Sequence, residues 1–135
     1  MKYFTLSVIL LVVLVGVFIL WAFLRNLGTS SSAKINPADA KKRLDIEQGI
    51  ILLDVRTRDE YLGKHIPKSI LIPLNVLENE ASRKLPDKNA EIFVYCRSGN
   101  RSTMAVKILT KLGYTHIKNL GGIISWQYKT LSGNK

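Results

Sequence analysis

Cysteine, histidine and acidic residues are scarce in this chain. Its 135 residues include one cysteine, Cys96, and two histidines, while 10 acidic residues stand against 20 lysines and arginines, a formal net charge of +10 at pH 7. A single cysteine excludes an intramolecular disulfide framework and any multi-cysteine metal site. The two histidines, His65 and His116, are distant in the sequence. We therefore predict no metal site.

The excess of positive charge does not by itself favour a nucleic-acid partner. The lysines and arginines are scattered along the chain, and no basic stripe alternates with aromatic residues. Attraction to anionic lipid head groups, or a field that attracts small anions, explains the excess equally well. We therefore expect no nucleic acid among the partners.

Charge is also missing from residues 3–24, a long apolar run near the N-terminus. At about 1.5 Å per helical residue, this run spans roughly the 30 Å hydrocarbon core of a bilayer. Trp21 lies near its far end, where an indole prefers the membrane interface. A cleaved secretory signal is the alternative, but its apolar region has about 7 to 15 residues. We predict an uncleaved membrane anchor over residues 1–25 and a polar, flexible tether over residues 26–34.

Basic residues are distributed unequally about the predicted span. Lys2 precedes it, and the residues that follow are Arg25, Lys34, Lys41, Lys42 and Arg43. The positive-inside rule therefore favours a domain that faces the cytoplasm, and a lone cysteine suits a reducing compartment. The short segment before the span resembles that of a bacterial inner-membrane protein. We expect a single-pass protein of that membrane.

The rest of the chain alternates two kinds of pattern. Aliphatic and β-branched runs at 50–55, 69–73, 91–96 and 115–120 are typical of buried strands. Helical patterns lie between residues 37 and 49, 57 and 61, 74 and 85, 102 and 112, and 123 and 131. Asn36 is the predicted N-cap of the first, and Thr57 and Glu60 fit a capping box at the start of the second. In the fourth helix, Met104, Ile108 and Leu112 would form the core face. The alternation predicts an α/β fold with a largely parallel central sheet of four to five strands flanked by helices.

Cys96 ends the predicted strand 91–96, and Asp54 ends the strand 50–55. Sites in parallel sheets gather at the carboxyl ends of the strands, so both residues are expected in one neighbourhood. The sequence CRSGNRS follows, in which Gly99 permits a sharp turn because it tolerates positive φ. A tight turn ahead of a helix directs N–H groups inward and adds the partial positive charge of the helix N-terminus.

These features predict a reactive cysteine. Arg97 and Arg101 would add full positive charge if they point inward, and all of these groups favour a thiolate and lower the pKa of a cysteine from about 8.5. The alternative is a buried Cys96 that acts as a small hydrophobic residue.

The length of the loop indicates which group it can hold. Cysteine-based phosphatases have His-Cys, five residues and arginine, whereas Tyr95 precedes Cys96 and only four residues separate it from Arg101. The smaller cradle favours one extra sulfur atom over a phosphate.

Three motifs, in this order and at this spacing, resemble the single-domain rhodaneses, which are rhodanese-like sulfurtransferases. LLDVRTRDEYLGKHIPKSILIPL is similar to the family's first signature, with D-V-R, an acidic-aromatic pair, H-I-P and a second I-P. YCRSGNRS resembles the six-residue active loop, Cys96 to Arg101. NLGGIISW resembles the closing signature, with Trp126 in the family's position. The resemblance implies a rhodanese-like domain over residues 35–131.

By this resemblance the reaction is a two-step sulfur relay that needs no metal or organic cofactor. Cys96 would take a sulfane sulfur from a donor such as thiosulfate and become a persulfide, and a thiol, a protein acceptor or cyanide would then remove it. The loop residues that would hold the persulfide are Arg97, Ser98, Gly99, Asn100, Arg101 and Ser102. Arg101 would also help bind an anionic donor, Arg97 would line the mouth, and Asp54 and Arg56 would support the loop.

Other conspicuous residues are predicted to serve structure. His65 and His116 would pack, Gly121 and Gly122 would form a tight strand-to-helix turn, and Trp126 would pack the last helix against the sheet. The sequence departs from the family at the H-I-P motif: Lys64 replaces the usual glycine before it, and Lys68-Ser69 replaces the usual Gly-Ala after it. These lysines would alter the turn or line the approach with positive charge.

Two other functions compete with the membrane-anchored sulfurtransferase. A rhodanese-type module could bind or position a partner at the membrane without turnover, although a scaffold has no need of a thiol in such a cradle. A phosphatase or arsenate-reducing relative is disfavoured by the loop length and by the missing histidine before Cys96.

Overall fold

The computed structural model describes residues 1–26 and 33–134, so most of the predicted tether, residues 27–32, lies outside the described residues. Helix α1 (Lys2–Asn26) contains the predicted anchor. Its segment Thr5–Leu24 has a mean hydropathy of 3.0, and none of it is buried against other described parts of the chain. By length and composition α1 is a candidate membrane span.

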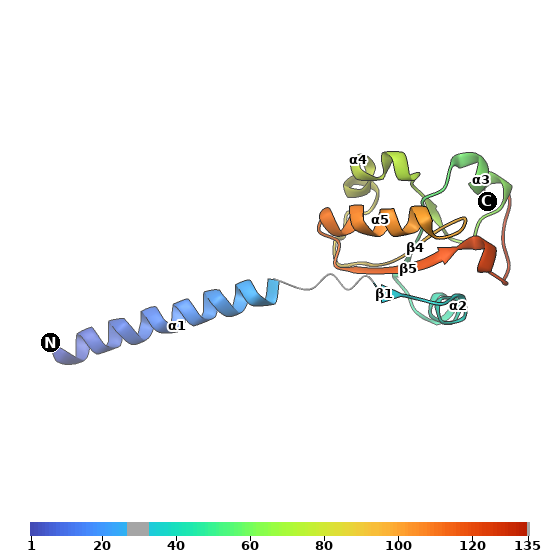
Figure 1. Cartoon of the computed structure of the whole chain (residues 1–135). Helices are drawn as coiled ribbons and strands as arrows, with labels where there is room; N and C mark the ends of the chain where they lie inside the picture. Colours follow the sequence, from blue (N-terminus) through green and yellow to red (C-terminus); the bar gives the residue numbers. More distant parts are fainter. Residues whose placement is uncertain (27–32, 135) are drawn as a thin grey trace.

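A five-stranded parallel sheet forms the centre of the rest of the chain (Figure 1), in the order β1-β5-β4-β2-β3. The strands are β1 (Ala33–Lys34), β2 (Ile51–Asp54), β3 (Ile70–Leu71), β4 (Glu91–Cys96) and β5 (His116–Gly122). The predicted α/β class and parallel sheet are therefore confirmed. The fifth strand, β1, comes from the last two residues of the predicted tether, which pair with Lys118 and Asn119 of β5.

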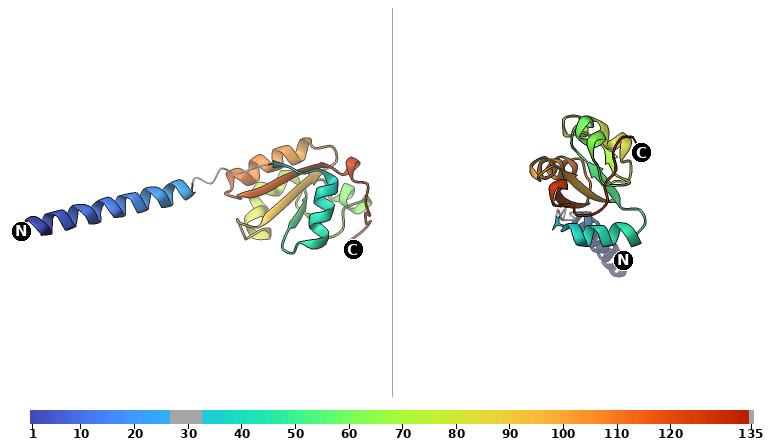
Figure 2. Two further views of the ribbon diagram at one scale, coloured as in Figure 1. Left: turned by 90° about the horizontal axis from the view of Figure 1, so that it is seen from below. Right: turned by 90° about the vertical axis from the view of Figure 1, so that its right-hand side faces the viewer.

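Helices cover both faces of the sheet, as the two further views in Figure 2 also show. They are α2 (Pro37–Ile46), α3 (Arg58–Gly63), α4 (Leu74–Lys84), α5 (Asn100–Lys111) and the short 3-10 helix η1 (Ile123–Ser125). Two start where the sequence predicts a cap. The Asn36 side chain accepts a hydrogen bond from the Asp39 N–H, and Thr57 and Glu60 form a reciprocal capping box on α3.

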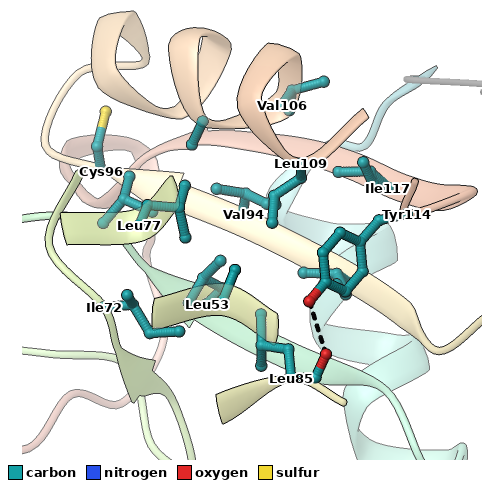
Figure 3. Close-up of a cluster of buried hydrophobic side chains, with 14 residues drawn as sticks. Leu53, Ile72, Leu77, Leu85, Val94, Cys96, Val106, Leu109, Tyr114 and Ile117 are labelled. Atoms are coloured by element: carbon teal, nitrogen blue, oxygen red, sulfur yellow. Dashed lines mark hydrogen bonds between the residues drawn. The ribbon is translucent and has the colours of Figure 1, made fainter. Parts of the chain in front are cut away.

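Two apolar clusters hold the layers together. The larger lies between the sheet and helices α4 and α5. Figure 3 labels ten of its residues and shows the Tyr114 hydroxyl, which donates to the Leu85 carbonyl at 2.6 Å. The smaller one joins the other face to α2 and η1 and includes Leu52, Phe93 and Tyr95. Because strands β2 and β4 contribute to both clusters, they are buried on both faces, as expected of parallel strands.

The predicted core face of the helix at 102–112 is wrong at Met104, which is 55% exposed. Ile108 and Leu112 do pack against the larger cluster, but both are only partly buried. The buried residues of α5 are Ser102, Ala105, Val106 and Leu109. These four also have helical spacing, and their smaller side chains allow the helix to approach the sheet closely. The orientation of α5 therefore follows from its small residues and from the loop that precedes it.

The predicted last helix, residues 123–131, is also wrong beyond its first turn. Only η1 is helical, and the chain continues as an irregular segment, residues 126–134, which we call the C-terminal strap. Leu131 and His65 exchange two backbone hydrogen bonds of 2.8 Å, and the Gly133 N–H donates to the Leu62 carbonyl. These bonds to the end of α3 and to the residues after it replace hydrogen bonds that a helix would have made.

Candidate active site

Cys96 lies at the carboxyl end of β4, directly before the turn that opens α5. Figure 3 shows its sulfur directed away from the sheet, toward the start of α5. Gly99 adopts φ +111°, in the left-handed region, and its N–H donates to the Cys96 Sγ at 3.0 Å. The turn therefore aims a backbone donor at the sulfur, and a residue with a side chain would be strained at this φ.

The electrostatics of the loop favour the thiolate form of Cys96. The residue is 1% exposed, and this burial works against ionisation. Hydrogen bonds from the backbone N–H groups of Ser102, Gly99 and Ser98, with a contribution from the Ser102 hydroxyl, outweigh the burial and lower the pKa of the thiol. The Ser102 hydroxyl itself donates to the Gly99 carbonyl at 2.9 Å. The cysteine is thus buried like a hydrophobic residue, yet it is surrounded by donors that stabilise a negative sulfur.

The end of β5 packs directly against the backbone of the active loop. Register shifts by one residue between Val94 and Tyr95, so that Cys96 pairs with Gly122. Gly122 lies so close to the backbone of Arg97 and Ser98 that no larger residue fits there without displacing the loop. The predicted tight glycine turn is thus an extension of β5, and its second glycine is a contact surface for the active loop.

Arg101, the sixth loop residue, is held by a carboxylate. Its guanidinium donates to Glu60 of α3 through Nη1 at 2.7 Å and Nη2 at 2.8 Å, a bidentate ion pair. Hydrogen bonding from Arg101, together with that from Thr57, lowers the pKa of Glu60 to about 2 against a partial burial that raises it. Sequence reasoning missed Glu60, although its position in the capping box could have drawn attention to it. The pair ties α3 to the loop.

Asp54 and Arg56, the predicted supporting residues, form a buried ion pair at the end of β2. The Arg56 Nη2 donates to Asp54 Oδ2 at 2.6 Å and to the Lys64 carbonyl at 2.7 Å. The backbone N–H of Arg56 also donates to Asp54 Oδ1 at 2.9 Å. Because Lys64 directly follows α3, the pair holds the C-terminal end of the helix that carries Glu60, the partner of Arg101.

Tyr95, which precedes Cys96, anchors the turn after α3 from inside the core. Its hydroxyl accepts from the Ile66 N–H and donates to the Ser69 Oγ, both at 3.1 Å. Burial and the nearby charge of Asp54 raise its pKa, so the hydroxyl stays protonated.

His65 was predicted to be structural. Its ring stacks on the ring of Tyr61 in α3, with centroids 3.9 Å apart. His65 therefore packs at the edge of the site.

A hollow of about 330 Å³ opens beside the loop, which we call the mouth hollow. Gly63, Ile123 and Ile124 give it apolar walls, and Lys64 and Arg97 line it with positive charge. Neither of these two cations has an ion-pair partner in the described part of the chain. The same residues 1–26 and 33–134 contain no group of three histidine, cysteine or acidic side chains placed to hold a metal.

The fold and this loop geometry define the class of protein, and comparisons with known families agree. A family model described as the rhodanese-like domain matches residues 36–129. The chain therefore belongs to the rhodanese-like domain family.

The chain is similar to named sulfurtransferases and sulfur carriers. It is 39% identical over 71 residues to thiosulfate sulfurtransferase PspE of Escherichia coli K12, covering 53% of this chain and 68% of that protein. It is 35% identical over 119 residues to the putative sulfur carrier protein YrkF of Bacillus subtilis, covering 83% of this chain but only 63% of YrkF. The crystal structure of the Alr3790 protein from Anabaena superposes with a TM-score of 0.69 at 29% identity, over 75% of this chain and 94% of that one. The names of PspE and YrkF both refer to the handling of sulfur.

Proposed function

We propose that this protein is a membrane-anchored sulfurtransferase that carries a sulfane sulfur as a persulfide on Cys96. The main support for this proposal is the environment of the Cys96 sulfur. The Cys96 sulfur lies at the end of β4 where the Gly99 N–H donates to it at 3.0 Å, and the surrounding donors lower the pKa of the thiol. A lowered pKa is what a nucleophilic cysteine needs near neutral pH.

The relay requires no external oxidant or reductant. With thiosulfate as donor, the Cys96 thiolate attacks the sulfane sulfur, a new S–S bond forms, and sulfite leaves with the electron pair of the bond that breaks. A thiolate or cyanide acceptor then attacks the terminal sulfur, and the electron pair of the Cys96 S–S bond returns to Cys96. The loop residues 97–102 supply backbone N–H groups that hold the negative terminal sulfur, as an oxyanion hole holds oxygen.

The donor that this site suits is a small anion with a terminal sulfur. Cys96 is only 1% exposed, which favours a slender attacking partner over a bulky one. Arg97 and Lys64 supply unpaired positive charge at the mouth hollow. Since Arg101 is already bound to Glu60, we assign attraction of the donor to Arg97 and Lys64 and support of the loop to Arg101. The acceptor is a small thiol or a thiol-bearing protein, and the similarity to YrkF, which is named as a sulfur carrier protein, supports the second.

The membrane part of the proposal rests on α1. Residues 1–25 would anchor the chain, residues 26–34 would tether it, and residues 35–131 would form the catalytic domain. The fold extends slightly beyond residues 35–131. Strand β1 begins at Ala33, and Gly133 of the strap donates a hydrogen bond to Leu62. The length and hydropathy of Thr5–Leu24 support an anchor, and the basic residues that follow it support a cytoplasmic domain at a bacterial inner membrane.

The test uses the full chain in detergent micelles with thiosulfate, followed by intact mass measurement. We expect Cys96 to gain one sulfur atom, which cyanide or a thiol removes and which the Cys96→Ser variant never gains. No adduct with thiosulfate or with other sulfane donors, in a folded sample whose thiol reacts with iodoacetamide, would overturn the proposal. A rhodanese-type binding module without turnover would then be the better description.

A further inference from the structure

A second hollow, of about 310 Å³, lies on the face of the sheet that α2 covers, and we call it the lysine hollow. It is enclosed by α2, by the segment that leads into β2, by the turn at 66–68 and by the C-terminal strap. Gly49 and Ile50, which line it, precede β2, whereas Cys96 is the last residue of the neighbouring strand β4. No residue of the active loop or of the mouth hollow lines it, and in Figure 2 α2 and the last segment of the chain can be followed around this face.

The floor of the lysine hollow is apolar. Leu44, Leu52, Ile66 and Trp126 line it, and all four belong to the smaller core cluster or pack against it. The Trp126 indole N–H donates to the Lys129 carbonyl at 3.2 Å, which orients the ring within the strap. A fixed indole beside aliphatic side chains offers a surface for a flat or aliphatic group.

The rim carries an excess of positive charge. Lys41 is paired with Asp45, and Glu47, the other acid that lines the hollow, is paired with Arg43. The remaining cations of the rim, Lys68 and Lys129, have no ion-pair partner among residues 1–26 and 33–134. The acids of the rim are therefore already paired, and the ammonium groups of Lys68 and Lys129 remain unpaired beside the apolar floor.

The backbone of Lys68 adds an independent observation. Its φ is +66°, and it is the only residue other than glycine with a positive φ among those described. A lysine in the left-handed region costs about 1 to 2 kcal/mol relative to the right-handed region. Strain of this kind gathers at ligand sites, where the side chain has a use that offsets it. Here the strained residue presents one of the two unpaired charges of the hollow.

We propose that the lysine hollow binds a small organic anion, one with a carboxylate or similar group for Lys68 and Lys129 and an apolar or aromatic body for the floor around Trp126. This site is separate from the sulfur relay, so it stands whether or not Cys96 transfers sulfur. The volume suits a ligand with a single ring, since a cavity of this size is at the lower end of small-molecule pockets.

The test uses the full chain in detergent with Trp21→Phe, which leaves Trp126 as the only tryptophan. Its fluorescence is followed during titration with phenylacetate, with the neutral analogue phenylacetamide and with acetate, which lacks the apolar body. A micelle sample without protein serves as blank. We expect saturable binding of phenylacetate, with phenylacetamide and acetate each weaker by about fivefold or more, the equivalent of roughly 1 kcal/mol.

Two variants identify the rim. Lys68→Gly with Lys129→Ala removes both unpaired charges, and glycine suits the left-handed backbone at position 68, so loss of folding is not expected. This double variant should weaken phenylacetate binding by about fivefold or more, whereas Lys64→Gly, in the mouth hollow, should leave it unchanged. Equal binding of the amide, unchanged binding in the double variant, or no saturable binding would each overturn the proposal.

Discussion

A methyl group added to Gly122 would lie 2.3 Å from the carbonyl oxygen of Arg97 and 2.6 Å from the Cα of Ser98. Both contacts are with backbone, so the active loop has to move to admit a side chain, and the Gly99 N–H moves with it. The geometry around Cys96 thus depends on a glycine in the next strand.

Gly122→Ala is therefore expected to impair sulfur uptake and to lower the free energy of unfolding by about 1 to 3 kcal/mol, the usual cost of overpacking. Mass measurement of the persulfide and urea unfolding check the two effects. Gly121→Ala is the matched control. Its φ of +86° makes alanine strained, but the added methyl group meets nothing within 4 Å. It should lose stability and keep sulfur uptake. Wild-type sulfur uptake in Gly122→Ala would contradict the assignment.

Ser102 should control how easily Cys96 ionises. Its backbone N–H and its hydroxyl both lower the pKa of the thiol. Ser102→Ala keeps the N–H and removes only the hydroxyl, so it should raise that pKa in part and slow alkylation at neutral pH. The rate of iodoacetamide alkylation as a function of pH measures this directly, because the chain has one cysteine. Thr103→Ala is the control, since the Thr103 hydroxyl also donates to the Gly99 carbonyl at 2.9 Å but is not among the groups that shift Cys96. An equal shift in both variants would contradict the role of Ser102.

The order of the elements follows from local patterns in the sequence. The run EIFVYC gives β4 over the range expected, 91–96, because an uninterrupted apolar segment of this length must be buried on both faces. The caps at Asn36 and Thr57 lie where predicted because they depend on residues three positions away. The cysteine loop is equally local, and its glycine turn was predictable from Gly99.

Features that depend on distant partners were not predictable in this way. Residues 123–131 have helical spacing, but Leu131 bonds to the backbone of His65 instead. The pair of Glu60 and Arg101 joins residues 41 positions apart, and nothing local links them. Met104 was misassigned to the core face of α5 because it is hydrophobic, whereas the buried positions are Ser102, Ala105, Val106 and Leu109. In each case tertiary contacts outweighed the local pattern.

The pair of Glu60 and Arg101 should make stability depend on pH in the acid range. The folded pKa of Glu60 is about 2, below the value of about 4.3 expected in the unfolded chain. Its contribution is therefore fully present above about pH 4.5 and is lost as pH falls toward 2. Urea unfolding of Glu60→Gln should show a shallower loss over this range, and at neutral pH a deficit of about 1 kcal/mol or less for a half-exposed pair.

Glutamine at position 60 can keep the capping box, so this variant isolates the ion pair. Glu78→Gln, which removes an exposed carboxylate on α4, controls for the change in net charge. An acid dependence in Glu60→Gln as steep as that of the wild type would show that the pair does not contribute.

Lys64 should raise the rate of encounter with an anionic donor without taking part in bond formation. It lines the mouth hollow with Arg97, so Lys64→Gln should lower kcat/KM for thiosulfate by about threefold to fivefold at low salt, mainly through KM. The difference should shrink as ionic strength rises. Lys107→Gln, on the exposed side of α5, controls for net charge. A loss that is equal in both variants, or that persists at high salt, would contradict a local role.

The protein should be more stable with glycine than with lysine at position 68. The φ of +66° at Lys68 is unfavourable for any residue with a side chain, so Lys68→Gly should raise the free energy of unfolding by about 0.5 to 1 kcal/mol after the greater entropy of glycine in the unfolded chain is subtracted. Lys64→Gly is the matched control, because Lys64 is extended with φ −165°. It gains no relief of strain, and should lose about 0.5 to 1 kcal/mol. Urea unfolding of both variants measures the sign of the change in the free energy of unfolding.

If Lys68→Gly also loses stability, the left-handed backbone is not strained. If it gains stability, lysine at this position is kept at a cost to the fold, as expected of a residue whose side chain serves the lysine hollow.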